Sequence, residues 1–266
     1  MCYPGIMSQD VALVTGASSG IGEALAKRIA ATGRRLVLVA RRADRLQVIA
    51  RDIEAKHGVE ADVMPADLGV PSARQGLVEE LSRRDLTVDW LVNNAGFGTN
   101  GRFHELPVER ELEEIRLNVE ALVDLTGRFM PPMIARHRGA IINVSSVAGY
   151  CPGPYTATYS ATKAFVSSFS EAIAVEARGT GVDVLCVCPG FTRTEFQDRA
   201  EIDTSALPGF VWMSADEVAD QVVRSVGKGP VLVNGMLNRV MAMTMRYTPH
   251  ALLGRVAEGL LRPRNA

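Results

Sequence analysis

The chain predicts a single-domain α/β fold with a doubly wound parallel sheet. Short runs of consecutive apolar residues recur along the sequence, and longer stretches with helical spacing separate them. Unbroken apolar strands suit a sheet that is buried on both faces, and the intervening helices supply crossovers between parallel strands. The expected strands are 11–14, 36–40, 59–64, 90–92, 140–144, 182–187 and 231–233.

Length and composition limit the classes of function. At 266 residues, with 47% hydrophobic and 22% charged residues, the chain suits one large globular domain, which we expect over residues 10–266 after a loose leader at 1–9. The formal net charge of −1 gives no general attraction to nucleic acid. No segment reaches the roughly 18 apolar residues of a membrane span, and no signal-peptide pattern is present. We therefore expect a cytoplasmic protein whose partner is a small molecule.

The four cysteines do not form a disulfide framework. Cys186 and Cys188 lie two apart in an apolar strand, and no further His or Cys stands nearby to complete a ligand set. We expect both thiols in the core and no metal site.

A glycine-rich turn follows the first expected strand. Glycines let backbone amides approach a pyrophosphate at a helix N-terminus, where the helix dipole favours negative charge. The spacing differs from Gly-x-Gly-x-x-Gly and, as Gly-x-x-x-Gly-x-Gly, resembles the short-chain dehydrogenase/reductase family, whose fold is Rossmann-type; a purely structural turn is the alternative. The cofactor contacts expected here are Gly16, Ser18, Ser19, Gly20, Ile21 and Gly22.

Two arginines, Arg41 and Arg42, end the second expected strand, where a protein that prefers NAD offers an acid to the ribose. A guanidinium pairs well with a 2′-phosphate, so we predict NADP(H), with Arg41 the stronger candidate. The glycine turn has Ser18 and Ser19 where the family sometimes has a second basic residue, and the arginines could simply solvate a strand end.

The resemblance implies further cofactor contacts after the third and fourth strands. It assigns Asp67 to the adenine amino group, with a turn aspartate as the alternative, and it places residues 93–96 in the cofactor channel and as a brace of the sheet. Buried asparagines such as Asn93 need hydrogen-bond partners whatever their role. The contacts expected from these two loops are Asp67, Leu68, Asn94, Ala95 and Gly96.

A long helix is expected over 108–136. Asn118 is a mediocre helix former there, and the resemblance implies that it bends the helix and holds a water that passes protons to the active-site lysine. Two prolines, Pro131 and Pro132, are expected to distort or end the helix. Its apolar residues Leu122, Leu125 and Phe129 could form core or a subunit interface, and we expect a homodimer or homotetramer.

Tyr159 and Lys163 are four residues apart on an expected helix, so both side chains can address one site. A free tyrosine titrates near ~10, so proton transfer near neutrality requires a pKa lowered by roughly 3 units, about 4 kcal/mol. A lysine charge about 4 Å away supplies on the order of 4 kcal/mol at an effective dielectric of about 20. A Tyr-x-x-x-Lys pair alone also occurs by chance on amphipathic helices.

The family resemblance covers about the first 195 residues, with Ser145, Tyr159 and Lys163 in the correct order. It implies a catalytic set in which Tyr159 exchanges the proton, Ser145 holds the substrate oxygen and Lys163 keeps the phenol acidic and binds the nicotinamide ribose. Ser146 and Tyr155 are rivals for the serine and tyrosine roles. After the sixth strand, the resemblance implies cofactor contacts from Pro189, Gly190, Thr192 and Thr194.

The last part of the chain carries an expected substrate lid at 191–213 and a helical tail at 236–266. The lid contains Phe196, Leu207, Phe210 and Trp212, which indicate an apolar substrate unless they pack on the domain. The tail has helical spacing of apolar residues and breaks near Pro249. It could dock on its own domain, on another subunit or on a membrane surface.

These features predict an NADP(H)-dependent oxidoreductase that interconverts a carbonyl and a secondary alcohol. The resemblance is closest to 3-oxoacyl reductases and hydroxysteroid dehydrogenases, which implies a small, apolar substrate. The alternatives are a non-catalytic NADP(H)-sensing regulator on the same fold and a membrane-surface scaffold that uses the tail.

Overall fold

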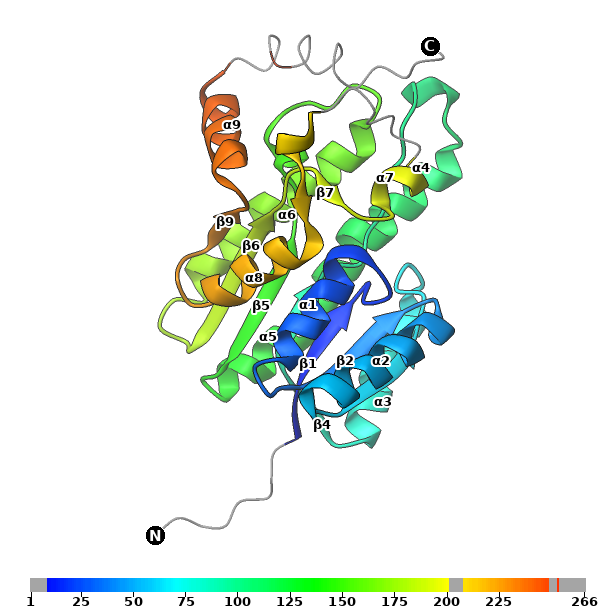
Figure 1. The fold of residues 1–266 in the computed structure, drawn as a ribbon, viewed down its shortest axis with the longest axis vertical. Coiled ribbons are helices and arrows are strands. Elements are labelled where there is room, and N and C mark those ends of the chain that lie inside the picture. Colours follow the sequence, from blue (N-terminus) through cyan, green and yellow to red (C-terminus); the bar gives the residue numbers. More distant parts are fainter. Residues whose placement is uncertain (1–8, 201–207, 249–252, 254–266) are drawn as a thin grey trace.

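The computed structural model describes residues 9–200, 208–248 and 253. Within these residues a seven-stranded sheet has the order β3-β2-β1-β4-β5-β6-β9, and all neighbours are parallel (Figure 1). Every expected apolar run overlaps one of its strands, although the run 59–64 begins two residues before β3, so the predicted fold class is confirmed. The strands are β1 Gln9–Thr15, β2 Arg35–Ala40, β3 Ala61–Pro65, β4 Leu86–Asn93, β5 Gly139–Val144, β6 Val182–Cys188 and β9 Val231–Val233.

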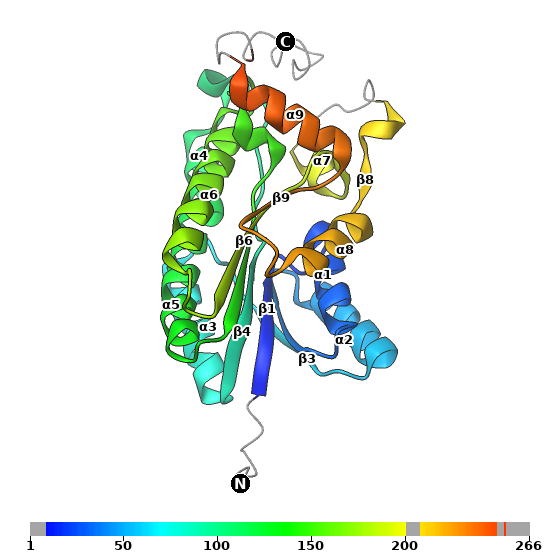
Figure 2. The same ribbon diagram turned by 90° about the vertical axis from the view of Figure 1, so that its left-hand side faces the viewer.

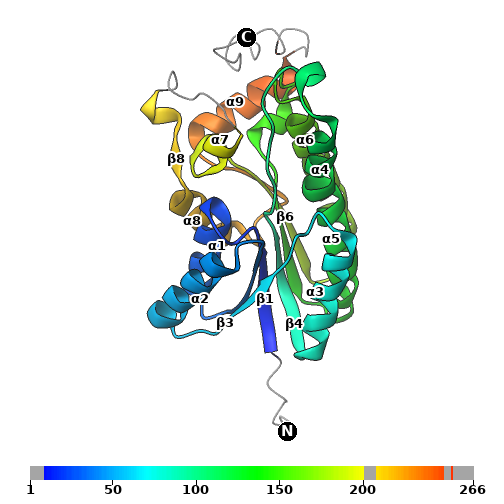
Figure 3. The same cartoon turned by 90° about the vertical axis from the view of Figure 1, so that its right-hand side faces the viewer.

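Helices cover both faces of the sheet, as Figures 2 and 3 show. One layer contains α1 Gly20–Ala30, α2 Ala43–His57 and α8 Ala215–Ser225. The other contains α3 Pro71–Arg83, α4 Val108–Ile115, α5 Ala121–Ala135 and α6 Ala157–Glu176. Side chains alternate along a strand, so Ala12 and Val14 pack in the first core, while Val11 and Leu13 pack in the second.

The expected long helix is continuous but irregular. A π-helical turn, Arg116–Glu120, joins α4 to α5 and contains Asn118. Pro131 and Pro132 were expected to distort or end the helix, and they do not end it: both lie inside α5, which continues to Ala135. A proline near a helix end removes a single backbone donor, and the buried face of α5 holds this last turn against the sheet. Leu122, Leu125 and Phe129 are buried within the chain itself.

The cysteine prediction is confirmed for the strand pair: Cys186 and Cys188 are fully buried in β6. Among the described residues, no cluster of His, Cys, Asp and Glu is arranged to hold a metal ion. None of the helices in the described ranges has the length and hydropathy that crossing a membrane requires.

Short elements form a cap over the carboxyl ends of the strands. They are η1 Phe103–Glu105, η3 Val147–Tyr150, β7 Thr192–Arg193, α7 Phe196–Arg199, η4 Gly209–Val211, β8 Met213–Ser214 and α9 Met236–Tyr247. Helix α9 crosses the top of the sheet in Figure 2 and contacts η3 and β9. The chain order reverses between β1 and β4, and open α/β sheets bind ligands in the crevice at such a point. Leu207 and the expected break near Pro249 lie outside the described residues.

Candidate active site

A cleft of about 1460 Å³ opens along the carboxyl edge of the sheet. Every residue predicted to contact the cofactor lines it, from the glycine turn at Gly16 to Thr194 after β7. Ser145, Tyr159 and Lys163 line it as well, whereas Asn118 lies behind its wall and its neighbour Leu117 takes that place. The sequence therefore brings the predicted nucleotide and chemical residues into one cavity.

The glycine turn leaves a space that a side chain would fill. A Cβ on Gly22 would lie 2.3 Å from the Gly16 carbonyl oxygen and 2.4 Å from Asn94 Nδ2. Asn94 donates from Nδ2 to the Thr15 carbonyl oxygen at 2.9 Å, which ties the turn to the end of β4. The Ser19 side chain makes no capping bond at the start of α1, so the first amides of that helix remain available to an anion.

Both predicted phosphate-binding arginines line the cleft, in different settings. Arg41 is the more exposed, and its guanidinium lies 3.9 Å from the Asp67 carboxylate. Arg42 donates from Nε to Ser18 Oγ at 3.2 Å and from Nη2 to the Ser18 carbonyl oxygen at 3.1 Å. Arg42 also lies 3.2 Å from Glu195. Arg42 is therefore held against the glycine turn, which the sequence did not indicate.

Asn93 and Asn94 have separate tasks. Asn93 is buried and donates from Nδ2 to Asn143 Oδ1 at 2.9 Å and to Thr126 Oγ1 at 3.1 Å. Asn93 thus braces β4 against β5 and α5, while Asn94 faces the cleft. Asp67 accepts the backbone N–H of Gly69 at 3.0 Å, as a turn aspartate does, and also lines the cleft, so both interpretations of Asp67 fit.

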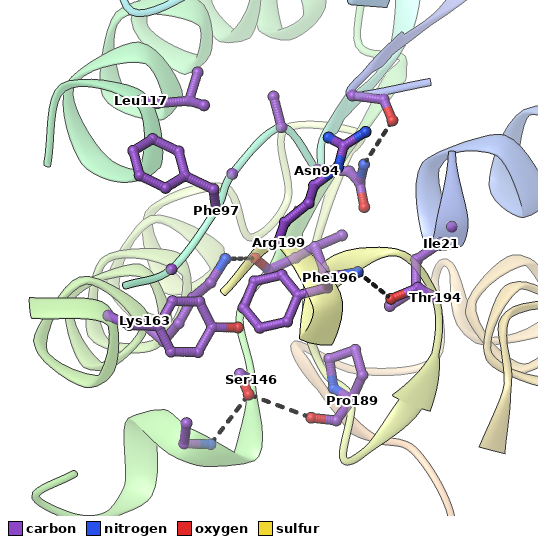
Figure 4. A pocket seen from close by; sticks show the side chains of 18 of the residues that line it. Ile21, Asn94, Phe97, Leu117, Ser146, Lys163, Pro189, Thr194, Phe196 and Arg199 are labelled. Atoms are coloured by element: carbon purple, nitrogen blue, oxygen red, sulfur yellow. Dashed lines mark hydrogen bonds between the residues drawn. The ribbon is translucent and has the colours of Figure 1, made fainter. Parts of the chain in front are cut away.

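The two candidate serines have different hydrogen-bond partners, which favour Ser146 over Ser145 as the oxyanion-binding residue. The Ser145 hydroxyl donates to the Lys163 carbonyl oxygen at 2.7 Å and lies 2.8 Å from Ser167 Oγ, so its proton is already committed within the protein. The Ser146 side chain lies close enough to Tyr159 to lower the pKa of the phenol. Its hydroxyl accepts the N–H of Ala148 at 3.1 Å and makes only a long bond, 3.5 Å, to the Pro189 carbonyl oxygen (Figure 4). Side chains alternate in extended chain, which is why adjacent serines have different neighbours.

Lys163 and Tyr159 face the cleft from one side of α6, as their spacing predicted. Lys163 Nζ donates to the Val144 carbonyl oxygen at 2.9 Å and lies 5.6 Å from the centre of the Tyr159 ring. Burial lowers the pKa of Lys163 to about 8, while Glu114 opposes this shift. The lysine is therefore charged at neutral pH.

The expected acidification of the phenol is not found. Burial raises the pKa of Tyr159 to about 12; a hydrogen bond from Ser146 lowers it and the Glu114 carboxylate raises it. The sequence argument omitted the cost of desolvating a phenolate, which exceeds these local effects. Tyr159 is consequently a protonated phenol throughout the neutral range, the form that donates a proton.

Asn118 supports the loop that follows β4. Its Oδ1 accepts the Phe97 N–H at 3.1 Å, and its Nδ2 donates to the Phe97 carbonyl oxygen at 2.8 Å and to Thr162 Oγ1 at 3.1 Å. The π-helical turn that carries Asn118 agrees with an irregular helix at this position. The side chain thus ties α6 and the cleft wall to one point of the long helix.

Phe97, Met241 and Met245 line the substrate end of the cleft, although the sequence did not predict this place for them. Phe97 lies beneath the Arg110 guanidinium, 3.9 Å from the ring centre, and Phe196 packs on Tyr159 with ring centres 5.2 Å apart. Figure 4 shows Phe97 and Phe196 among the lining side chains. Met241 and Met245 reach the cleft from α9. Among the expected lid aromatics, Phe196 faces the cleft, whereas Phe210 is 77% exposed and Trp212 packs on Phe191. Only the tertiary fold reveals these neighbours.

Comparisons with known proteins agree with this geometry. The short chain dehydrogenase family model matches residues 10–204. The 7beta-hydroxysteroid dehydrogenase of Collinsella aerofaciens is 32% identical over 235 residues, covering 85% of this chain and 86% of that protein. The very-long-chain 3-oxoacyl-CoA reductase of Anas platyrhynchos is 34% identical over 251 residues, covering 92% of this chain and 74% of that protein. The structure of a short-chain dehydrogenase from Sphingobium yanoikuyae in complex with NADPH has a TM-score of 0.79 and 33% identity, covering 91% and 97%.

The doubly wound sheet and its glycine-rich cleft define a dinucleotide-binding oxidoreductase. The chain belongs to the short-chain dehydrogenase/reductase family. It is an enzyme that uses a nicotinamide cofactor and interconverts a carbonyl and an alcohol. The residues present fit such a cofactor. The turn at Gly22 has no room for a side chain, so the backbone can approach the cofactor closely, and no side chain caps the first amides of α1.

Proposed function

We propose that the protein is an NADP(H)-dependent carbonyl reductase in which Tyr159 donates the proton and Ser146 holds the substrate oxygen. The observation that carries this proposal is that Ser146 and Tyr159 both line the cleft that contains the glycine turn, with the Ser146 side chain near enough to lower the pKa of the phenol. Two hydroxyl groups that converge on one point can both hydrogen-bond a carbonyl oxygen. Ser145 is not part of the proposed set.

A reduced nicotinamide cofactor, when bound in the cleft, would supply hydride to the carbonyl carbon of the substrate. As negative charge develops on the oxygen, the Ser146 hydroxyl stabilises it and the Tyr159 phenol delivers its proton to that oxygen. A secondary alkoxide is a much stronger base than a phenolate, so a phenol with a pKa near 12 gives up its proton readily. The protonated phenol is the form that reduction uses, and the reverse reaction would need the phenolate.

Lys163 and Asn118 support this step in different ways. The charged Lys163 ammonium, fixed on the Val144 carbonyl, stabilises the phenolate that remains after proton transfer. We assign it to the nicotinamide ribose as well, by likeness to the family. Asn118 positions the Phe97 loop and α6 relative to each other, and we assign the proton-passing water of the family to its backbone turn.

The preference for NADP(H) is supported by Arg41 and Arg42, which both face the cleft at the end of β2. The glycine turn supplies the first helical amides of α1 for the pyrophosphate, and Arg42 is already oriented by Ser18. A guanidinium beside the ribose favours a 2′-phosphate through charge-assisted hydrogen bonds. We assign the remaining expected contacts to the cofactor because they line the same cavity: Asp67, Leu68, Asn94, Ala95, Gly96, Pro189, Gly190, Thr192 and Thr194.

The proposed substrate is an apolar ketone of the 3-oxoacyl or hydroxysteroid type. Phe97, Phe196, Met241 and Met245 supply apolar surface at the substrate end of the cleft. Methionine and aromatic side chains bind apolar ligands of varied shape. The names of two relatives, a hydroxysteroid dehydrogenase and a 3-oxoacyl-CoA reductase, point to the same class.

We also propose a homodimer or homotetramer. Apolar side chains that face outward on α4, α5 and α6 support this, since a monomer gains nothing from exposing them. They are Leu112, Ile115, Val123 and Phe165. Light scattering coupled to gel filtration tests the proposal, and a monomer at micromolar concentration contradicts it.

The function is tested by following NADPH oxidation with acyl, steroid, quinone and sugar carbonyls, and then by repeating the assay with NADH. We expect turnover on an apolar ketone with NADPH, little with NADH, and a loss of at least about 100-fold in kcat for Tyr159→Phe. Tyr155→Phe is the matched control and retains activity. Dominant use of NADH contradicts the roles of Arg41 and Arg42, and full activity of Tyr159→Phe contradicts the mechanism.

A further inference from the structure

A carboxyl group with no assigned task is buried behind the active site. Glu114 is on α4, which packs against α6, and its relative exposure is 0%. Its Oε2 accepts the hydroxyl of Thr99 at 3.0 Å, and its Oε1 lies 3.5 Å from the amide nitrogen of Asn118. Burying a carboxyl costs free energy unless partners compensate it, so this position calls for an explanation.

Asn118 links Glu114 to the catalytic lysine. A Cβ on Gly96 would lie 2.8 Å from Asn118 Oδ1 and 3.7 Å from Lys163 Nζ, so the amide and the ammonium flank the same point of the cleft wall. Asn118 also bonds Thr162, the residue before Lys163. Glu114, Asn118 and Lys163 therefore form one buried group, with Tyr159 one turn along α6.

The charges around Glu114 come from three elements. On α4, Glu111 raises the pKa of Glu114, and on α6, Lys163 lowers it. In the loop after β4, the Thr99 hydroxyl and backbone stabilise the ionised form, although burial still raises the pKa of Glu114 to about 7. Arg110 stacks on Phe97 of this loop, but it is paired with Glu113 at 2.8 Å. Lys163 is also near Cys186 and Cys188 of β6.

We propose that Glu114 is a positioning residue that keeps the protons on Lys163 and Tyr159 at alkaline pH, and so extends the pH range of carbonyl reduction. The proposal rests on the proposed roles of Tyr159 and Lys163. Reduction needs both groups protonated, because the phenol donates and the ammonium stabilises the phenolate. A nearby carboxylate opposes the loss of either proton, so both effects act in the same direction.

The test compares Glu114→Gln with Glu113→Gln, an exposed neighbour on the same helix. The measurement is kcat/KM for NADPH-dependent reduction of ethyl acetoacetate, or of the best ketone of the panel, between pH 6 and 10. For Glu114→Gln we expect the alkaline inflection to move down by about half a unit to one unit, so the deficit grows about threefold to tenfold from pH 6 to pH 9. Glu113→Gln keeps the wild-type inflection. An unchanged inflection in folded Glu114→Gln overturns the proposal.

A second variant covers the case in which Glu114→Gln does not fold. Thr99→Val removes the hydroxyl that stabilises the carboxylate, so a smaller shift in the same direction is expected, and its absence then overturns the proposal. Tyr159→Phe separates this inference from the proposed function. If Tyr159→Phe is inactive and both Glu114→Gln and Thr99→Val keep the wild-type profile, the inference alone fails. If Tyr159→Phe is fully active, the proposed function fails.

Discussion

The Ser145 hydroxyl donates to the carbonyl oxygen of Lys163 at 2.7 Å, one residue before the hydroxyl that contacts Tyr159. We therefore expect substitution of Ser146 to impair activity and substitution of Ser145 to impair stability. Ser146→Ala removes an oxyanion donor, and we expect kcat to fall about 100-fold or more with little change in stability. Ser145→Ala leaves a buried acceptor without its partner, and we expect a loss of about 1 to 3 kcal/mol in unfolding free energy with most activity retained. Urea titration and steady-state kinetics of both variants check this, and the reverse pattern restores Ser145.

Replacing Lys163 by methionine should abolish activity while raising the free energy of unfolding. The pKa of this buried lysine is depressed from 10.5 to about 8, so its charge opposes folding by about 3 kcal/mol below pH 8. The unfolded state binds more protons between these values, so this contribution makes the protein more stable as pH rises from 8 to 10.5. Loss of the hydrogen bond to the Val144 carbonyl reduces the stability gained by removing the charge by about 1 kcal/mol. We expect Lys163→Met to be inactive but more stable at pH 7.

Denaturant unfolding of Lys163→Met at pH 7 and pH 10 is the measurement. The increase in unfolding free energy of Lys163→Met over wild type should be smaller at pH 10 than at pH 7. Lys56→Met, on the exposed surface of α2, is the control and should change stability by no more than about 0.5 kcal/mol. A variant that is less stable than wild type at both pH values contradicts the sign of the depressed pKa.

The cradle at Gly22 gives a sharp steric prediction. Gly22→Ala places a methyl group 2.3 Å from the Gly16 carbonyl oxygen, so the turn must shift. We expect a loss of about 1 to 3 kcal/mol in stability and a weaker affinity for NADPH, measured by fluorescence titration. Gly76→Ala, in α3 with no atom near the new Cβ, should instead gain about 0.5 to 1 kcal/mol. Unchanged NADPH binding by Gly22→Ala contradicts a close fit at this turn.

The aromatic residues after β6 predict a difference in substrate binding. Phe196 packs on Tyr159 and lines the cleft, whereas Phe210 of the same segment is exposed. We expect Phe196→Ala to raise the KM for 2-decanone about fivefold to thirtyfold and the KM for 2-butanone much less, because the longer chain buries more apolar surface. Phe210→Ala should change neither constant by more than about twofold. Equal effects of the two variants argue against apolar recognition by this segment.

The strands and the two faces of the sheet could be predicted from the sequence because a doubly covered sheet needs unbroken apolar runs, such as the one that became β6. The residues proposed to contact the cofactor could be placed in the cleft from the sequence, since most of them lie within a few residues of a strand end. The choice between Ser145 and Ser146 did not follow, because it depends on which way one residue points after β5. The pKa of Tyr159 was misjudged for a related reason: burial is a property of the assembled cleft and not of a four-residue spacing.

A second limit of prediction from the sequence concerns residues such as Glu114, Met241 and Met245. Each reaches the site through packing of elements that are distant along the chain, and an acid on an amphipathic helix or a methionine in the tail has no local pattern that distinguishes it from a surface or core residue. The π-helical turn around Asn118 was expected only from family likeness.

The cleft is lined by two kinds of architecture. Strand ends and α6, which the whole sheet holds in place, line one part, and α7 and α9 contribute Phe196, Met241 and Met245. Phe196 packs on the proton donor Tyr159, whereas the two methionines come from α9. An engineer who wants a new specificity should therefore randomise Met241 and Met245 and leave Phe196 and the scaffold intact.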